Sequence, residues 1–194
     1  MSERERLFFG TALDVEAAAI VASRQASLGR RDLPLRLVPE GNLHLTLRFI
    51  GDSRVLDRER KLAGIDKLAL PGAFDVTLQG WGAFPKARSA KVIWIGVSDP
   101  AGGLQRLHEI TERAAVQAGF PSEDRPYSPH LTVARLRFPH DVRQALEVAE
   151  EISLKVTVSR CTLFKSVLRG GHPLYEPTCS YLLSGHESLR TSRP

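Results

Sequence analysis

The chain has 194 residues, of which 42% are hydrophobic and 25% charged, and its formal net charge is +5. This length supports one large domain or two small lobes, and no apolar run is long enough to span a bilayer. The positive charge suits a phosphate-rich partner but is not specific for one. The charged start, MSERERLFF, has no apolar signal-peptide region, so we expect a cytoplasmic protein with no membrane partner.

The predicted elements alternate between strands and helices along the whole chain. The expected strands cover residues 6–13, 43–50, 74–79, 92–97, the run around 130–133, 154–168 and 174–183. The expected helices cover residues 15–28, 54–70, 100–118 and 142–150. This order predicts an α+β fold with a duplicated unit. Because no linker divides it, we expect a single domain over residues 1–185 and a disordered tail over 186–194.

Turn and capping residues set the predicted boundaries. Gly51 to Ser53 should end the second strand, and residues 80–85 should be irregular because they are glycine-rich. Asp14 and Asp99 are predicted helix caps, the latter with Pro100 as the first helical residue. Asp141 and Gln144 have the spacing of a capping box. Gly170-Gly171 should form the turn of a closing hairpin.

The two cysteines, Cys161 and Cys179, are too few for a disulfide framework. If residues 169–173 form the hairpin loop, Cys161 lies opposite Tyr181, so the two thiols need not meet. No short metal-ligand spacing such as C-x-x-C or H-x-x-x-H occurs. We therefore expect no metal and no other cofactor.

The tripeptide His-Leu-Thr occurs twice in strand-like runs, with His44 and His130 separated by 86 positions. Side chains alternate along a strand, so His44, Thr46 and Arg48 should share one face while the leucines pack on the other. His130 and Thr132 should share a face in the same way. Each run thus offers an imidazole with a hydroxyl beside it.

Two imidazoles, each beside a hydroxyl, are what a metal-free phosphodiester-cleaving site needs. One imidazole takes a proton from the nucleophile, while the other gives a proton to the leaving oxygen. A lone histidine in a strand is more often satisfied by a backbone carbonyl. The repetition of the tripeptide favours the catalytic interpretation.

The segments HLTLRFIG and PHLTVAR resemble the paired His-x-Thr-x motifs of the two-histidine phosphoesterases, specifically the RNA 2′,3′-cyclic phosphodiesterase, or 2′-5′ RNA ligase, family. The resemblance continues through RLFFGTAL, GAFP, KVIWIGV and LFKSVL. Val133 replaces an expected leucine, and Lys165 stands where an acidic residue is expected. The resemblance implies two pseudo-symmetric lobes, each an antiparallel sheet backed by helices, with the histidine strands facing across a central cleft.

The resemblance also implies hydrolysis of 2′,3′-cyclic phosphate ends of RNA to 2′-phosphates. His44 would be the proton donor and His130 the proton acceptor, while Thr46 and Thr132 would stabilise the transition state. By microscopic reversibility the same groups would catalyse 2′-5′ ligation. The expected partners are RNA with a 2′,3′-cyclic phosphate or a 2′-5′ linkage and cyclic nucleotides, bound by a monomer.

Further residues are candidates for substrate binding. Arg135 matches the arginine that closes the second family motif, yet strict alternation places it on the Leu131 face unless the strand ends or bulges after Ala134. Arg48 and Phe49 follow the first motif.

Two aromatic residues and two basic clusters each have a functional and a structural interpretation. Trp81 and Phe84 would either stack on a base or seal the edge of the core. The basic clusters would either contact phosphate or remain solvated; they are Arg30, Arg31 and Arg36, and Lys86, Arg88 and Lys91.

Two alternatives stay open. A non-catalytic RNA-binding module on the same fold would be indicated by loss of either histidine or both threonines, but all four are present. A metallohydrolase would use His44, His130 and His172 as ligands, and a chelator tests it.

Overall fold

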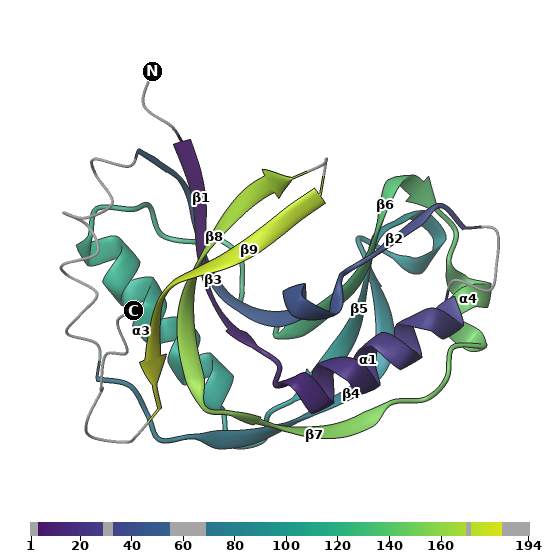
Figure 1. Cartoon of the computed structure of the whole chain (residues 1–194), viewed down its shortest axis with the longest axis horizontal. Helices are drawn as coiled ribbons and strands as arrows, with labels where there is room; N and C mark the ends of the chain where they lie inside the picture. The colour runs from purple at the N-terminus through teal and green to yellow at the C-terminus, as the bar shows by residue number, and fades with distance from the viewer. Residues whose placement is uncertain (1–3, 29–32, 55–68, 170–171, 184–194) are drawn as a thin grey trace.

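The computed structural model of the chain describes residues 4–28, 33–54, 69–169 and 172–183 (Figure 1). The helix predicted over 54–70 falls mainly on residues 55–68, outside this part. The Gly170-Gly171 turn, Arg30, Arg31 and the predicted tail also lie outside it.

The described elements follow one another in the predicted alternation. The strands are β1 (Arg4–Ala12), β2 (Leu35–Leu37), β3 (His44–Arg54), β4 (Phe74–Phe84), β5 (Ala90–Ser98), β6 (His130–His140), β7 (Ser153–Val158), β8 (Arg160–Arg169) and β9 (His172–Leu182). The α-helices are α1 (Val15–Leu28), α3 (Gly103–Gln117) and α4 (Arg143–Glu147), and short 3-10 turns cover Glu40–Asn42 and Ala87–Ser89.

The strands form one antiparallel sheet in the order β7-β4-β5-β6-β3-β1-β8-β9, with β2 added on β6. The two histidine strands, β3 and β6, meet in the middle at the residue pair Leu45 and Leu131. The sheet therefore divides into two halves that diverge from this point. Figure 1 shows α3 against the half that contains β1, β8 and β9, and α1 and α4 with the other half. The predicted α+β fold with two antiparallel halves is confirmed.

Burial follows the predicted alternation at both motifs. Leu45 is 1% exposed and Leu131 is fully buried, whereas the histidines and threonines beside them are partly exposed. Burying two leucines beneath the motifs stabilises the junction of the halves by about 1.5–3 kcal/mol for each side chain. The same packing leaves the polar face of each motif open.

The first predicted helix cap is confirmed and the other two are wrong in detail. The Asp14 carboxylate accepts a hydrogen bond from Ala17 N at 2.7 Å. Asp99 accepts from the first two N–H groups of α3, at 3.0 and 2.7 Å, but α3 begins only at Gly103. Gly102, with φ 66°, completes a turn before the helix, so Pro100 is not its first residue.

The predicted capping box at Asp141 does not form. The Asp141 carboxylate instead accepts from the backbone N–H and the guanidinium of Arg143. α4 is correspondingly short and ends at Glu147 rather than at Glu150.

Two strand boundaries also differ from prediction. β3 continues through Gly51, with φ 82°, to Arg54. β4 continues through the supposedly irregular segment to Phe84, because Gly80, with φ 68°, absorbs a register shift against β5. Glycine at both positions lets the strand bend without being interrupted.

The strand predicted over residues 154–168 is two strands that serve different halves of the molecule. It divides at Ser159, so that β7 pairs with β4 while β8 pairs with β1 and β9. The β8–β9 hairpin itself is confirmed, and Cys161 lies opposite Tyr181 as predicted. Both cysteines are free, and burial raises the pKa of the Cys161 thiol to about 12, as expected for an unreactive core thiol.

Candidate active site

His44 and His130 open β3 and β6, one residue before the Leu45–Leu131 pair that joins the strands. The same antiparallel register sets His44 opposite Thr132 and Thr46 opposite His130, at the place where the strands diverge. All four side chains line one cavity of about 960 Å³. The structure therefore brings the four predicted catalytic residues together around an approximate two-fold axis.

The two imidazoles have the same hydrogen-bond geometry. His44 Nδ1 lies 2.7 Å from the Asn42 carbonyl, and His130 Nδ1 lies 2.8 Å from the Ser128 carbonyl. A carbonyl only accepts, so Nδ1 carries the proton in both rings and Nε2 is the nitrogen available for proton transfer. In the neutral ring, His44 Nε2 accepts from the Thr46 hydroxyl at 3.1 Å.

Burial and neighbouring charge lower the pKa of both histidines. Desolvation lowers the pKa of His44 to about 4, assisted by the charges of Arg135 and His130 and opposed by the Asn42 carbonyl. Desolvation is also the largest cause that lowers the pKa of His130, again with a contribution from Arg135. Both rings are thus neutral near pH 7 in the absence of an anion.

Aromatic rings hold the two imidazoles in place. The centre of the His44 ring lies 4.9 Å from the centre of the Phe8 ring. It lies 4.9 Å from the centre of the Tyr175 ring, which it meets edge-on. His130 meets Phe84 edge-on at 5.0 Å. Edge-to-face packing restricts the rotation of each ring and excludes water from its faces.

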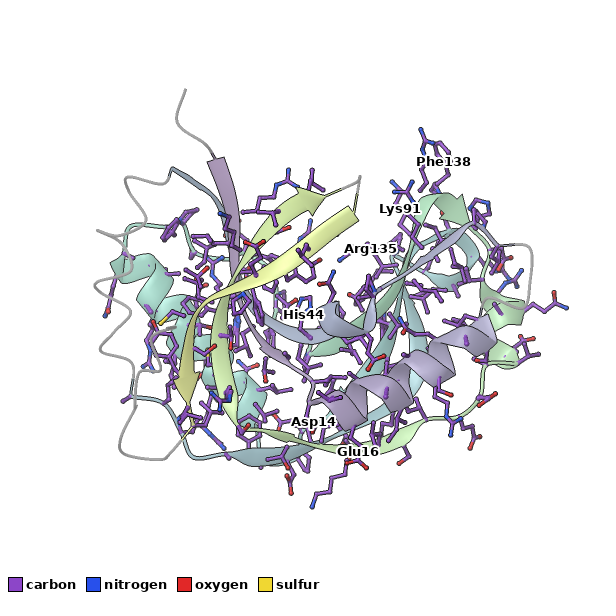
Figure 2. The ribbon with its side chains drawn as sticks, in the orientation of Figure 1. Asp14, Glu16, His44, Lys91, Arg135 and Phe138 are labelled. Atoms are coloured by element: carbon purple, nitrogen blue, oxygen red, sulfur yellow. The ribbon has the colours of Figure 1, made fainter. Side chains whose placement is uncertain are left out.

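A bulge after the second motif brings Arg135 into the cavity. In the pairing of β6 with β5, Trp94 lies opposite Thr132 and Ile93 opposite Ala134, so Val133 is the extra residue. Val133 and Ala134 are both buried, and Arg135 returns to the cavity face and lines the cavity. The bulge that Arg135 requires exists, although it lies before Ala134 rather than after it. Figure 2 shows Arg135 between the two halves.

An equivalent bulge after the first motif corrects the prediction for Arg48. Gly10 of β1 lies opposite Thr46 and Phe9 opposite Arg48, so Leu47 is the extra residue. Arg48 is consequently 4% exposed and points away from His44, while Phe49 is 56% exposed and lines the cavity. The predicted common face of His44, Thr46 and Arg48 is therefore wrong at Arg48. Phe49 and Arg135 occupy equivalent positions, each three residues after its threonine.

Arg48 instead joins three segments behind the site. Its guanidinium forms an ion pair with Glu112 on α3, lies 3.4 Å from the Glu123 carboxylate and donates to the Pro121 carbonyl. Tyr127 of the same loop donates to the Thr46 carbonyl at 3.2 Å. These contacts fix residues 121–129, which lead directly into His130.

The two aromatic residues that are candidates for stacking on a base, Trp81 and Phe84, lie in different places. Phe84 lies against His130 and lines the cavity. Trp81 packs against the core and donates from Nε1 to the Glu150 carbonyl at 2.9 Å, away from the cavity. Trp81 thus takes the structural alternative, and of these two aromatic residues only Phe84 remains a candidate substrate contact.

Several cavity residues were missed from the sequence. Arg6, Phe8 and Tyr175 line the cavity, as does Lys165, which the sequence shows only as a departure from the family pattern. They meet because β8 pairs with β1 and β9, with Leu7 opposite Lys165. In the sequence, only the basic residues within RLFF and LFKS indicated a role for these segments. They did not indicate that the two segments pair with each other.

Neither a metal cluster nor a membrane-spanning helix is found in the described residues. No group of three or more His, Cys, Asp or Glu side chains there is placed to hold a metal ion, and the His172 side chain lies outside that set. None of the described helices is long and apolar enough to cross a membrane.

Comparison with known proteins defines the class. A family model described as the 2′-5′ RNA ligase superfamily matches residues 14–169. The chain is 32% identical over 163 residues to an RNA 2′,3′-cyclic phosphodiesterase of Aeropyrum pernix, covering 80% of this chain and 90% of that protein. It is 29% identical over 186 residues to the Escherichia coli protein of the same name, covering 95% and 99%.

Solved structures agree with this assignment. A Thermus thermophilus protein has a TM-score of 0.78 at 28% identity, covering 94% of this chain and all of that one. Escherichia coli LigT in complex with 3′-AMP has a TM-score of 0.75 at 26% identity, covering 93% and 99%. This chain belongs to the 2′-5′ RNA ligase superfamily, as its paired motifs predict.

Proposed function

We propose that this chain hydrolyses 2′,3′-cyclic phosphate ends of RNA to 2′-phosphates, using His44 and His130 as a metal-free acid–base pair. The observation that carries the proposal is the shared geometry of the two histidines. Each has Nδ1 bound to a carbonyl and Nε2 available, and both line one cavity with Thr46 and Thr132. The relatives named RNA 2′,3′-cyclic phosphodiesterase support the choice of substrate.

In the proposed reaction, water attacks phosphorus while His130 accepts its proton. The bond from phosphorus to O3′ breaks, and protonated His44 gives its proton to O3′, leaving a phosphate on O2′. The donor and acceptor assignments follow the family resemblance. The Thr46 and Thr132 hydroxyls and Arg135 donate hydrogen bonds to the non-bridging oxygens, where negative charge develops.

The low pKa of His44 makes its acid role depend on the substrate. Without a bound phosphate, burial and the Arg135 charge favour the neutral ring. A bound phosphate compensates Arg135 and places a negative charge beside the imidazole, which raises the His44 pKa. The proton donor is therefore formed together with the enzyme–substrate complex.

Ligation follows from the same groups with a different nucleophile. A 5′-hydroxyl in place of water would lose its proton to His130 and attack phosphorus. The bond from phosphorus to O3′ would break as His44 protonates O3′, which leaves a 2′-5′ linkage. The superfamily description supports this as a second activity. We further propose a cytoplasmic monomer, because the described residues of one chain supply both histidines and both threonines of the cavity and the free thiols fit a reducing compartment.

Product analysis tests the proposal. A 2′,3′-cyclic mononucleotide is incubated with the protein, and the position of the phosphate is read by phosphorus NMR. The proposal requires the 2′-phosphate as the product. A 3′-phosphate, or no turnover of either a mononucleotide or an RNA end, would overturn it; RNA binding without turnover would favour the non-catalytic alternative.

A further inference from the structure

A row of cations continues from the cavity along β6. Arg36 of β2 lies directly opposite Arg135, and Arg137 follows two residues later. Like charges placed directly opposite each other in a sheet are destabilising. Within the described chain, Arg36, Lys91, Arg135 and Arg137 form no salt bridge with a carboxylate. An anion that lies against these exposed cations would relieve the repulsion between them.

The orientation of the row connects it to the site. Leu136 is buried between Arg135 and Arg137, so the two arginines project on the same side of the strand. Arg135 lines the catalytic cavity, and Lys91 lines an adjoining cavity. The two cavities share five residues, including Thr46 and His130. Figure 2 shows Arg135, Lys91 and Phe138 in succession from the cleft to the outer end of β6.

Phe138 supplies an aromatic surface at the end of this row. Its side chain is 60% exposed, and the Arg137 guanidinium lies over its ring, 5.3 Å from the ring centre. Cations that alternate with an exposed aromatic ring are typical of single-stranded nucleic-acid sites, where bases stack and phosphates pair with the cations. The positive charge disfavours an apolar or basic protein partner.

We propose that the β6 rim, defined as Arg36, Lys91, Arg135, Arg137 and Phe138, binds the single-stranded RNA immediately 5′ to the reacting end. This inference rests on the proposed function. Phe138 follows Arg135 by three residues across a register shift in β6, so it lies at most about 10 Å farther along the chain, at about 3.3 Å per residue. A strand with its terminal phosphate in the cavity therefore reaches Phe138 within a few nucleotides. Arg36, Lys91 and Arg137 pair with its phosphates, and a base stacks on Phe138.

The test compares a 2′,3′-cyclic mononucleotide with an oligoribonucleotide that ends in a 2′,3′-cyclic phosphate. Phe138→Ala and Arg137→Ala should each lower kcat/KM for the oligonucleotide about tenfold through KM, and leave the mononucleotide unchanged. Arg137→Ala should also reduce the salt dependence of oligonucleotide hydrolysis by about one unit of log–log slope. Matched controls on α3 are Val116→Ala and Arg113→Ala, both at exposed positions.

A second readout separates the rim from the chemistry. Fluorescence anisotropy measures the affinity of each variant for a labelled oligoribonucleotide with a 3′-phosphate, which requires no turnover. Weaker binding by the rim variants, with wild-type binding by the α3 controls, supports the rim even if the hydrolytic function fails. If both rim variants keep the wild-type affinity and KM for the oligonucleotide, the rim does not bind RNA. The proposed function would remain intact.

Discussion

Leu45 and Leu131, the central residues of the two His-x-Thr motifs, lie directly opposite each other where β3 meets β6. Both are buried, and each is flanked by a histidine and a threonine that line the cavity. This pair therefore fixes the relative position of the proposed acid and base.

Truncation of this pair should affect stability and turnover together. Leu131→Ala removes buried volume at the junction and should cost about 2–5 kcal/mol of unfolding free energy. It should also lower kcat more than it raises KM, because the two histidines lose their alignment. Urea unfolding and steady-state kinetics measure both effects, with exposed Val116→Ala as the control. A destabilised but fully active Leu131→Ala protein would show that the junction does not set the site geometry.

Arg48 should behave as a structural residue. Arg48→Leu leaves the Glu112 carboxylate, which is 20% exposed, without its cation, and should cost about 3–5 kcal/mol. The double variant Arg48→Leu/Glu112→Leu should recover part of this loss, while KM for a cyclic mononucleotide stays near wild type. A large rise in KM with unchanged unfolding in urea would instead make Arg48 a substrate contact.

The low pKa of His44 predicts a specific pH dependence of stability. Between the unfolded value of 6.5 and the folded value of about 4, the unfolded chain binds more protons at this residue. The contribution of neutral His44 is therefore complete above pH 6.5 and is lost as the pH falls toward 4, by on the order of 3 kcal/mol. Urea unfolding at several pH values should show a steeper decline for wild type than for His44→Gln. Parallel curves would mean that the pKa of His44 is not lowered.

Activity should persist in a chelator, because the proposed chemistry rests on two imidazoles. Turnover of a cyclic mononucleotide is compared before and after dialysis against EDTA, and the two rates should agree. Complete loss of activity that returns on addition of zinc would favour the metallohydrolase alternative.

The sequence predicted those features that depend on local alternation. The period of two along HLT places each histidine and threonine on one face, and the buried leucines between them confirm it. The positions of Arg48 and Arg135 could not be predicted with the same certainty. The position of Arg48 depends on a bulge at Leu47, where β3 pairs with β1. The position of Arg135 depends on a bulge at Val133, where β6 pairs with β5. The register that produces a bulge belongs to a pair of strands, not to one strand.

Long-range pairing limited the rest of the prediction. Residues 154–168 carry a continuous strand pattern, and only their partners, β4 in one half and β1 and β9 in the other, divide them at Ser159. Arg6 and Lys165 join the cavity through the same pairing of distant segments. Such contacts leave no periodic signal in the sequence.

The acid–base pair is tested most directly by a double-mutant cycle on the hydrolysis of a 2′,3′-cyclic mononucleotide. His44→Ala and His130→Ala should each lower kcat by about 10²–10⁴-fold, and the double variant should be little worse than either, because both residues act in one proton-transfer sequence. Thr46→Ala and Thr132→Ala should each cost on the order of 2–4 kcal/mol of transition-state stabilisation. A folded, soluble His130→Ala protein with near-wild-type kcat would contradict the two-histidine mechanism.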